Sequence, residues 1–206
     1  LWDKYPVEQV ATPEGYARNP ELVINFYNER RKQLLEVRPN DGHLGLAELE
    51  ADFNVTVVTQ NIDNLHERAG SRRIIHLHGE LTKVCSSRDP YNLHYIKELK
   101  PDEYEVKFGD KAGDGTQLRP FIVWFGEPVP EIETAVNYVE KADIFVIIGT
   151  SMNVYPAAGL LNYVPREAEV YLIDPKPVDV HSMRRIHVIQ KGASEGVREL
   201  RSLLQP

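Results

Sequence analysis

Cysteine is almost absent from this chain of 206 residues, in which Cys85 is the only one. A single cysteine excludes a disulfide within the chain and any metal site built from several of its own thiolates. The chain also lacks an apolar run approaching the roughly 18 residues that a membrane span needs. It has no charged and then apolar leader of the kind that directs secretion. These absences predict a cytoplasmic protein without membrane contact.

Positive charge is also scarce, because 24 Lys and Arg stand against 31 Asp and Glu, for a formal net charge of -7. Proteins that bind nucleic acid through its phosphates need a basic surface, so nucleic acid is not expected as a partner. The acidic balance is compatible with attraction to basic, lysine-bearing substrates. The hydrophobic fraction of 42% and the charged fraction of 27% are those of an ordinary globular domain.

Short β-branched runs alternate with helical patterns along the chain. The expected strands are 55–58, 74–78, 121–125, 144–148, 170–173 and 188–189. The expected helices are 20–37, 43–51, 63–69, 131–141 and 194–204. Buried strands that alternate with helices predict an α/β fold, with a mostly parallel sheet and helices on both of its faces.

The polar segment 86–117 fits neither pattern. We expect it to be a small insertion or subdomain between the two parts of the main domain, 1–85 and 118–206. Its own aromatic and aliphatic side chains should hold it together: Tyr91, Leu93, Tyr95, Leu99, Tyr104 and Phe108.

Ligands of parallel sheets bind outside the carboxyl ends of the strands, so the residues after each strand are the candidates for a site. They are Thr59–Asp63, His78–Glu80, Phe125–Glu127, Gly149–Ser151 and Asp174. The glycine and hydroxyls of Gly149–Ser151 can hold phosphate oxygens, and the Asp174 carboxylate can accept from a ribose diol. For both, an ordinary turn is the alternative.

Two histidines lie near the end of one expected strand. A histidine is a natural general base near neutral pH, and His78 stands at the strand end, where ligands bind. His76 lies one step back along the strand, where a hydrogen-bonded structural role is expected.

Four separated motifs resemble those of the sirtuins, in family order and with family-like spacing. They are Thr59–His66, His78–Glu80, Val123–Glu127 and Gly149–Ser151 followed by Val154 and Pro156–Ala158. The resemblance implies an NAD-dependent enzyme that removes acyl groups from protein lysines. It also implies a Rossmann-like large domain with a small inserted domain.

The resemblance implies roles for individual residues. Catalysis would involve His78, Asn61 and Asp63, with His78 as the general base. NAD would be held by Gln60, Asn61, Asp63, Gly149, Thr150, Ser151, Asp174 and Ala193. The acyl-lysine channel would be bordered by Val123, Phe125, Gly126, Glu127 and Val154. The products would be nicotinamide, free lysine and O-acyl-ADP-ribose, after His78 takes a proton from a ribose hydroxyl.

Two family features are missing from this sequence. Most sirtuins hold zinc with four cysteines in the small domain, whereas this chain has only Cys85, so no structural zinc is expected. A Gly-rich cofactor loop normally precedes the region of Leu1, so we expect the sequence to be incomplete at its start. Asp174 stands where the family usually has Asn, and its carboxylate can accept a hydrogen bond but not donate one.

The helix at 20–37 indicates which acyl group is removed. Arg30 lies within its apolar face, with Tyr27 three residues before it on the same side, whereas the neighbouring Arg31 is expected outside that face. A guanidinium and a phenol together form a receptor for a carboxylate. The pair resembles that of sirtuins that remove succinyl and malonyl groups, with acetyl also accepted. The alternatives are that Arg30 pairs with a protein carboxylate or extends its guanidinium to solvent.

Two other functions stay open at this point. One is a catalytically silent module that binds NAD or ADP-ribose, and the other is a mono-ADP-ribosyltransferase. His78 argues against the first, because a pure binder needs no base at that position. An acyl channel at 123–127 argues against the second.

Overall fold

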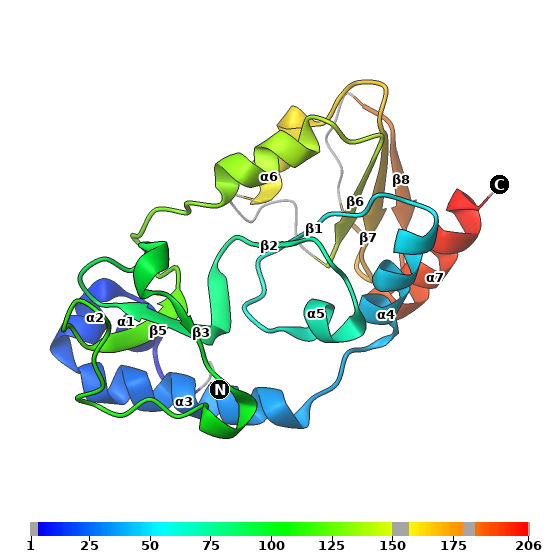
Figure 1. The fold of residues 1–206 in the computed structure, drawn as a ribbon. Helices are drawn as coiled ribbons and strands as arrows, with labels where there is room; N and C mark the ends of the chain where they lie inside the picture. Colours follow the sequence, from blue (N-terminus) through cyan, green and yellow to red (C-terminus); the bar gives the residue numbers. More distant parts are fainter. Residues whose placement is uncertain (1–3, 150–156, 179–183, 206) are drawn as a thin grey trace. The chain divides into compact units, whose positions relative to one another are not determined.

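The computed structural model describes residues 4–149, 157–178 and 184–205 (Figure 1). The chain divides into two compact units, each made of several segments. Unit 1 comprises residues 1–38, 59–64 and 76–130, and unit 2 comprises residues 39–58, 65–75 and 131–206. The segment 86–117 falls inside unit 1, together with the N-terminal helices. The domain bounds expected from the sequence stay a prediction.

Three helices open unit 1. They are α1 (Val7–Val10), α2 (Pro13–Arg18) and α3 (Pro20–Glu36). The side chains of Thr12 and Asn19 accept hydrogen bonds from the first turns of α2 and α3, and each helix starts with a proline. A capping side chain followed by proline is a strong start signal, and the helix predicted at 20–37 is confirmed.

The strands of unit 1 form an antiparallel sheet of order β4-β3-β5. They are β3 (Gly79–Ser86), β4 (Lys97–Glu98) and β5 (Leu118–Ile122). The expectation that 121–125 is a strand of the parallel sheet is therefore wrong, because β5 ends at Ile122 and runs antiparallel to β3. Strand pairing is set by contacts between distant segments, which a local pattern does not contain.

The packing of the segment 86–117 also differs from the expectation. Leu93 and Phe108 are 85% and 62% exposed, so they do not hold the segment together. Val106 and Ala112 of the segment pack instead into one core cluster with Ile24, Val84 and Leu118. Of the expected residues, Leu99 does pack against this cluster. The segment thus shares its core with α3 and β3. Two 3-10 turns, η2 (Leu93–Tyr95) and η3 (Pro101–Glu103), lie within it.

Unit 2 contains a parallel sheet of order β6-β7-β8. Its strands are β6 (Ile144–Ile148), β7 (Glu169–Ile173) and β8 (Ile186–Ile189), which confirms the three strands predicted there. Helices and 3-10 turns complete the unit. The helices are α4 (Asp41–Glu48), α5 (Leu65–Ala69), α6 (Ile132–Val139) and α7 (Ala193–Leu204), and the turns are η1 (Leu49–Ala51) and η4 (Ala157–Tyr163). Strands β1 (Val57–Thr59) and β2 (Ile74–His76) form a separate pair.

Strand β7 is the centre of the core of unit 2. Tyr171 and Ile173 share a buried cluster with Val197 and Leu200 of α7. Helix α7 approaches β7 so closely that a Cβ on Gly196 would lie 2.2 Å from Ile173. Val170 and Leu172 point to the other face and are fully buried as well, so the sheet is covered on both sides. The predicted α/β class is confirmed, although the described strands lie in three sheets rather than one.

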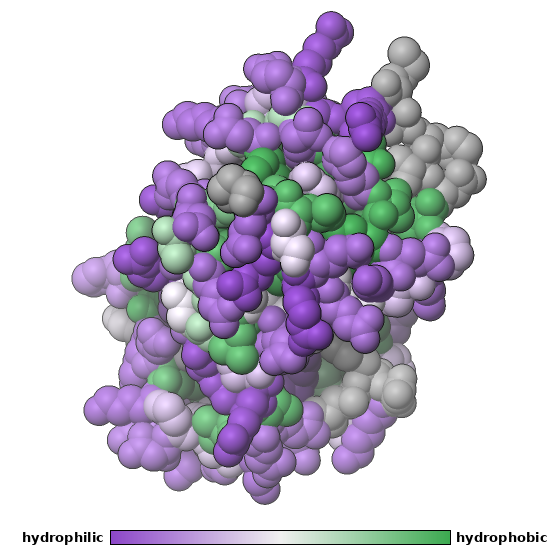
Figure 2. All heavy atoms as spheres, turned by 90° about the vertical axis from the view of Figure 1, so that its right-hand side faces the viewer, coloured by the Kyte–Doolittle hydropathy of each residue, from purple (hydrophilic) through white to green (hydrophobic). Residues whose placement is uncertain are grey.

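No helix in the described ranges has the length and apolarity to cross a bilayer. Hydrophilic residues cover most of the face that Figure 2 shows, with apolar residues in smaller areas between them.

Candidate active site around His78

His78 lies in a tight turn between two strands. Strand β2 ends at His76 and β3 begins at Gly79, so the expectation that the strand runs to His78 is wrong. The turn needs glycine at position 79, because its φ is +89° and a Cβ there would lie 2.1 Å from the Phe121 carbonyl oxygen. The His78 carbonyl accepts a hydrogen bond of 2.9 Å from Val123 N, which fixes the turn against the end of β5.

The environment of the His78 ring favours the neutral imidazole. Burial lowers its pKa from the ordinary value, and a hydrogen bond to the backbone of Gln60 partly opposes this shift. A neutral ring that donates one N–H to a carbonyl keeps a lone pair on its other nitrogen, as a general base requires. His76 differs, because it is buried and its Nδ1 donates to the Asn61 carbonyl at 3.0 Å, as expected of a structural histidine.

The loop that follows β1 carries the predicted residues Gln60, Asn61 and Asp63. Asn61 N donates to Thr59 Oγ1 at 3.0 Å, and Leu81 N donates to the Ile62 carbonyl at 2.8 Å, so the loop is attached to β3. Gln60 Nε2 is a buried donor without a hydrogen-bond partner in the described structure, and Asn64 Oδ1 is a buried acceptor in the same situation. Buried polar atoms are nearly always paired, so this donor and acceptor are suited to a polar ligand.

The predicted acyl receptor, Tyr27 with Arg30, lies on α3. Burial lowers the pKa of Arg30, while the charges of Tyr27 and Asp63 oppose that shift, so these three residues are neighbours. Tyr27 is fully buried, which raises its pKa to about 12. Its hydroxyl donates to the Val10 carbonyl at 2.9 Å and accepts from Trp124 Nε1 at 3.0 Å. The phenol proton is therefore directed to the backbone and not towards Arg30.

The sequence places Arg31 outside the apolar stripe of α3, and this is wrong. Arg31 is only 3% exposed, its Nε donates to the Leu81 carbonyl at 2.7 Å, and its Nη1 donates to Asn28 Oδ1 at 2.9 Å. Carbonyl and amide oxygens thus compensate the buried guanidinium without a carboxylate.

Residues Val123–Glu127 form a turn after β5. Phe125 N donates to the Ala11 carbonyl at 3.0 Å, and Glu127 N donates to the Trp124 carbonyl at 3.0 Å. The Phe125 side chain is 68% exposed, in keeping with a place on a binding surface. These residues follow an antiparallel strand of unit 1, and not the parallel sheet of unit 2 to which the sequence pattern assigns them.

The other predicted cofactor residues belong to unit 2. Gly149 and Asp174 directly follow β6 and β7, and their backbone N–H groups donate to the Ile173 and Ile189 carbonyls at 3.0 and 3.2 Å. They thus lie at one carboxyl edge of the β6-β7-β8 sheet, as expected. Asp174 Oδ1 accepts from Lys176 N at 2.8 Å, and Ala193 is the first residue of α7. Thr150, Ser151 and Val154 lie outside the described residues.

Arg119 and Trp124 are prominent in the structure and are not predicted from the sequence. Arg119 is 4% exposed, and its guanidinium forms a two-pronged ion pair with Glu127. The sequence signal for Arg119 would have been an arginine inside the apolar run 118–125, because a buried guanidinium needs a partner.

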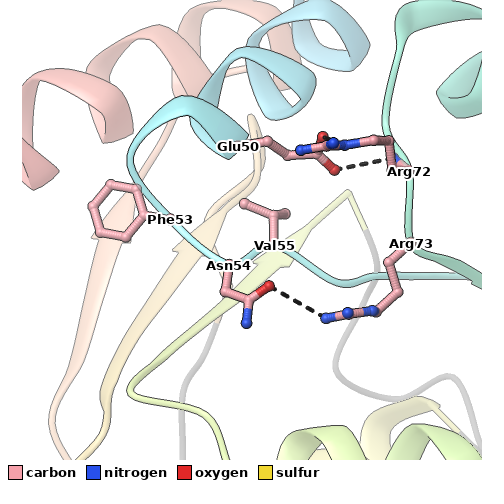
Figure 3. Close-up of a pocket in the computed structure, with 6 residues that line it drawn as sticks. All are labelled: Glu50, Phe53, Asn54, Val55, Arg72 and Arg73. Carbon is pink, nitrogen blue, oxygen red and sulfur yellow. Dashed lines mark hydrogen bonds and ion pairs between the residues drawn. The ribbon is translucent and has the colours of Figure 1, made fainter.

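A separate hollow of about 270 Å³ lies in unit 2, lined by Glu50, Phe53, Asn54, Val55, Arg72 and Arg73. Figure 3 shows that Glu50 faces Arg72 and that Asn54 faces Arg73, with an ion pair of 3.2 Å in the first case. None of the predicted site residues lines it. Glu50 is paired with Arg72, while Arg73 donates to the Asn54 amide and lies over the Tyr138 ring.

Comparison with known proteins places the chain in a family. Residues 1–156 match the Sir2 family model. The chain is 84% identical over its full length to an NAD-dependent protein deacylase of Bacteroides thetaiotaomicron, of which it covers 88%. It is 47% identical over 97% of its length to an NAD-dependent protein deacylase of Helicobacter pylori, of which it covers 85%.

Solved structures agree with this assignment. The crystal structure of a Sir2 homolog–NAD complex superposes on the whole chain with a TM-score of 0.80 and 34% sequence identity, and 81% of that protein is covered. The fold is therefore that of a Rossmann-like α/β protein of the sirtuin type. The chain belongs to the Sir2 family.

Proposed function

We propose that this protein removes acyl groups from lysine side chains of proteins in an NAD-dependent reaction that yields nicotinamide and O-acyl-ADP-ribose. The observation that carries the proposal is the half-buried His78 imidazole, whose environment favours the neutral form. The two relatives above are named as NAD-dependent protein deacylases, which supports the proposal. In this chain, His78 lies in the tight turn before β3. A cytoplasmic location is part of the proposal.

The residues present fit an NAD molecule. Gln60 Nε2 and Asn64 Oδ1 are a buried donor and a buried acceptor on one loop, and a carboxamide such as that of nicotinamide offers the complementary acceptor and donor. Gly149, with φ of +63°, and Asp174 lie at the sheet edge where nucleotides bind in parallel α/β folds. The other family residues, Thr150, Ser151 and Ala193, complete the proposed cofactor set.

The work of the protein is to bind, orient and move a proton. NAD, when bound, supplies a ribose carbon that becomes electrophilic as nicotinamide leaves. Asn61 and Asp63 orient the reactants from the loop after β1. One ring nitrogen of His78 donates to the Gln60 backbone, and the other accepts a proton from a hydroxyl group. The turn Val123–Glu127 holds the acyl-lysine segment, with Phe125 exposed for that contact.

Arg30 gives the acyl group its chemical class. It is a partly buried guanidinium on whose pKa Tyr27 and Asp63 act against the effect of burial. A succinyl or malonyl carboxylate would be attracted to Arg30, and an acetyl group needs no such contact. The proposed substrates are therefore succinyl- and malonyl-lysine, with acetyl-lysine also accepted.

The test is a mass-spectrometric assay of succinyl-, acetyl- and unmodified peptides with NAD. We expect lysine to be freed from both acyl peptides. Arg30→Met should lower desuccinylation by at least about tenfold and deacetylation by less than about twofold, because only the acidic acyl group uses the guanidinium. Lys32→Met, an exposed change on the same helix, is the control.

The same assay separates the alternative functions. Equal losses for both acyl peptides in Arg30→Met would refute the acidic-acyl assignment. ADP-ribose attached to the unmodified peptide would indicate a transferase. NAD binding without any product would indicate a silent binding module.

A further inference from the structure

The indole of Trp124 is the centre of a buried cluster in unit 1. Trp124 is 2% exposed, and the Arg119 guanidinium lies 3.8 Å from its ring centre. The ring of Tyr16 lies 5.3 Å away and that of Tyr27 lies 6.4 Å away. A guanidinium at this distance over an indole is a cation–π contact, which disfavours rotation of the ring.

Arg119 in turn is held by Glu127 through two parallel hydrogen bonds. Arg119 Nη1 donates to Glu127 Oε2 at 2.9 Å, and Nη2 donates to Oε1 at 3.0 Å. The side chains of the pair are only 4% and 12% exposed. Bidentate pairs of this kind are the strongest and most directional that side chains form.

The Glu127 carboxylate also holds the backbone of its own turn. Trp124 N donates to Glu127 Oε1 at 2.8 Å, so the same oxygen accepts from the backbone and from Arg119. The two lone pairs of Oε1 are thus both occupied, while Oε2 accepts from Arg119 Nη1. The contacts therefore assign Glu127 to positioning its own turn and Arg119.

The cluster reaches the predicted acyl receptor through one hydrogen bond. Trp124 Nε1 donates to the Tyr27 hydroxyl at 3.0 Å, and Tyr27 is the neighbour of Arg30 on α3. The Tyr27 hydroxyl also donates to the Val10 carbonyl, so one donor and one acceptor together fix its orientation.

We infer that Arg119 and Glu127 are positioning residues that hold the Trp124 indole. The indole fixes the Tyr27 phenol beside Arg30 and thereby holds in place the guanidinium on which the preference for acidic acyl groups depends. The inference rests on the proposed deacylase function and deepens it. It assigns acyl preference to a buried network as well as to Arg30. Weakening the ion pair should release the indole, and the phenol should then lose its fixed orientation.

The test uses Glu127→Gln, in which an amide NH2 would face the Arg119 donors and the ion pair is lost. We expect the KM of the succinyl peptide to rise on the order of tenfold, the equivalent of one lost hydrogen-bond network contact, and the KM of the acetyl peptide to rise less. The KM of NAD should stay unchanged. Arg119→Lys keeps the charge but loses the two-pronged hydrogen bonding, so it should raise the KM of the succinyl peptide by a smaller factor.

A spectroscopic measurement separates positioning from direct substrate contact. In a Trp2→Phe background, Trp124 is the only tryptophan, and its emission should shift in Glu127→Gln without any ligand. Glu131→Gln, an exposed glutamate four residues away, is the control and should change neither emission nor KM. Thermal unfolding shows which variants are folded.

Two results would overturn the inference. The first is an unchanged Trp124 emission together with a raised KM, which would mean that Glu127 touches substrate directly. The second is an equal rise in KM for both peptides, which would separate the network from acyl preference. Absence of all deacylation in the unaltered protein would instead refute the proposed function, while the emission shift would still report on the network.

Discussion

At the scale of single residues, the proposed general base is the His78 imidazole. Burial in the turn between β2 and β3 lowers its pKa, so the ring is neutral and able to accept a proton at neutral pH. The base is lost only when the pH falls below that lowered pKa. The acid limb of kcat/KM for the deacylation should therefore lie below pH 6.5, the ordinary value for histidine.

A pH series from about 5 to about 8 measures this limb. His78→Gln should abolish turnover at every pH while NAD binding survives. An acid limb above the ordinary histidine value would contradict the assignment, since it would require a stabilised imidazolium.

Arg30 and Arg31 are neighbours in the sequence with different environments. Arg31→Met should destabilise the protein by about 1–3 kcal/mol, because the Leu81 carbonyl and the Asn28 amide lose their donor in the interior. Urea unfolding measures this change, with Lys32→Met as the surface control on the same helix. A variant as stable as the parent would show that water replaces the guanidinium.

The sequence predicts the burial of Arg30 but not that of Arg31. The helical pattern assigns α3 its apolar face, and Arg30 is partly buried on it as expected. The same pattern misses the burial of Arg31, because its partners Leu81 and Tyr104 come from distant segments. A hydrophobic period of 3.6 residues predicts which side of a helix faces inwards, but not which residues that side contacts.

At the scale of elements, hydrogen bonds join the two ends of the segment 86–117. Ser86 Oγ donates to Asp114 Oδ2 and accepts from the N–H groups of Arg88 and Asp89 at 3.1 and 3.0 Å. Thr116 Oγ1 donates to Asp114 Oδ1 at 2.7 Å. Hydroxyl groups around one carboxylate thus tie the ends of this segment, which contains no cysteine.

The Asp114 carboxylate predicts an acid transition. Hydrogen bonds from Ser86 and Thr116 lower its pKa from the ordinary 3.8 to about 2. Because the folded pKa lies below the unfolded one, its contribution to stability is present above 3.8 and is lost as the pH falls through about 2. Thermal unfolding between about pH 5 and about pH 2 measures this loss, which Asp114→Asn should reduce.

The control for that experiment is Asp102→Asn, an exposed change within η3 of the same segment. If Asp114→Asn keeps the full acid dependence of the parent protein, then the carboxylate does not hold the segment. Chelating agents should leave the melting temperature unchanged, since the account needs no zinc.

Elements with strong local signals agree with the sequence, and those defined by pairing do not. The start of α3 follows from Asn19 and Pro20, and β6 follows from five consecutive apolar residues. The end of β2 at His76 depends instead on the approach of β5 to Gly79. Val106 is likewise buried in a cluster with Ile24, which lies 82 positions earlier in the chain (106 minus 24).

At the scale of the whole molecule, the proposed functional residues come from both units. His78 with the loop after β1 belongs to unit 1, and Gly149, Asp174 and Ala193 belong to unit 2. The sequence predicts each group from its place after a strand. It assigns them to one sheet, because it does not separate antiparallel from parallel strands. The family resemblance identifies the same residues through their motifs and needs no strand assignment.

The most direct test of the account is to count nicotinamide and free lysine in one reaction with a succinylated peptide. We expect one nicotinamide for each lysine freed by the unaltered protein, and neither product from His78→Gln at a concentration of NAD that the variant still binds. Lysine freed without nicotinamide release, or undiminished turnover by His78→Gln, would contradict it.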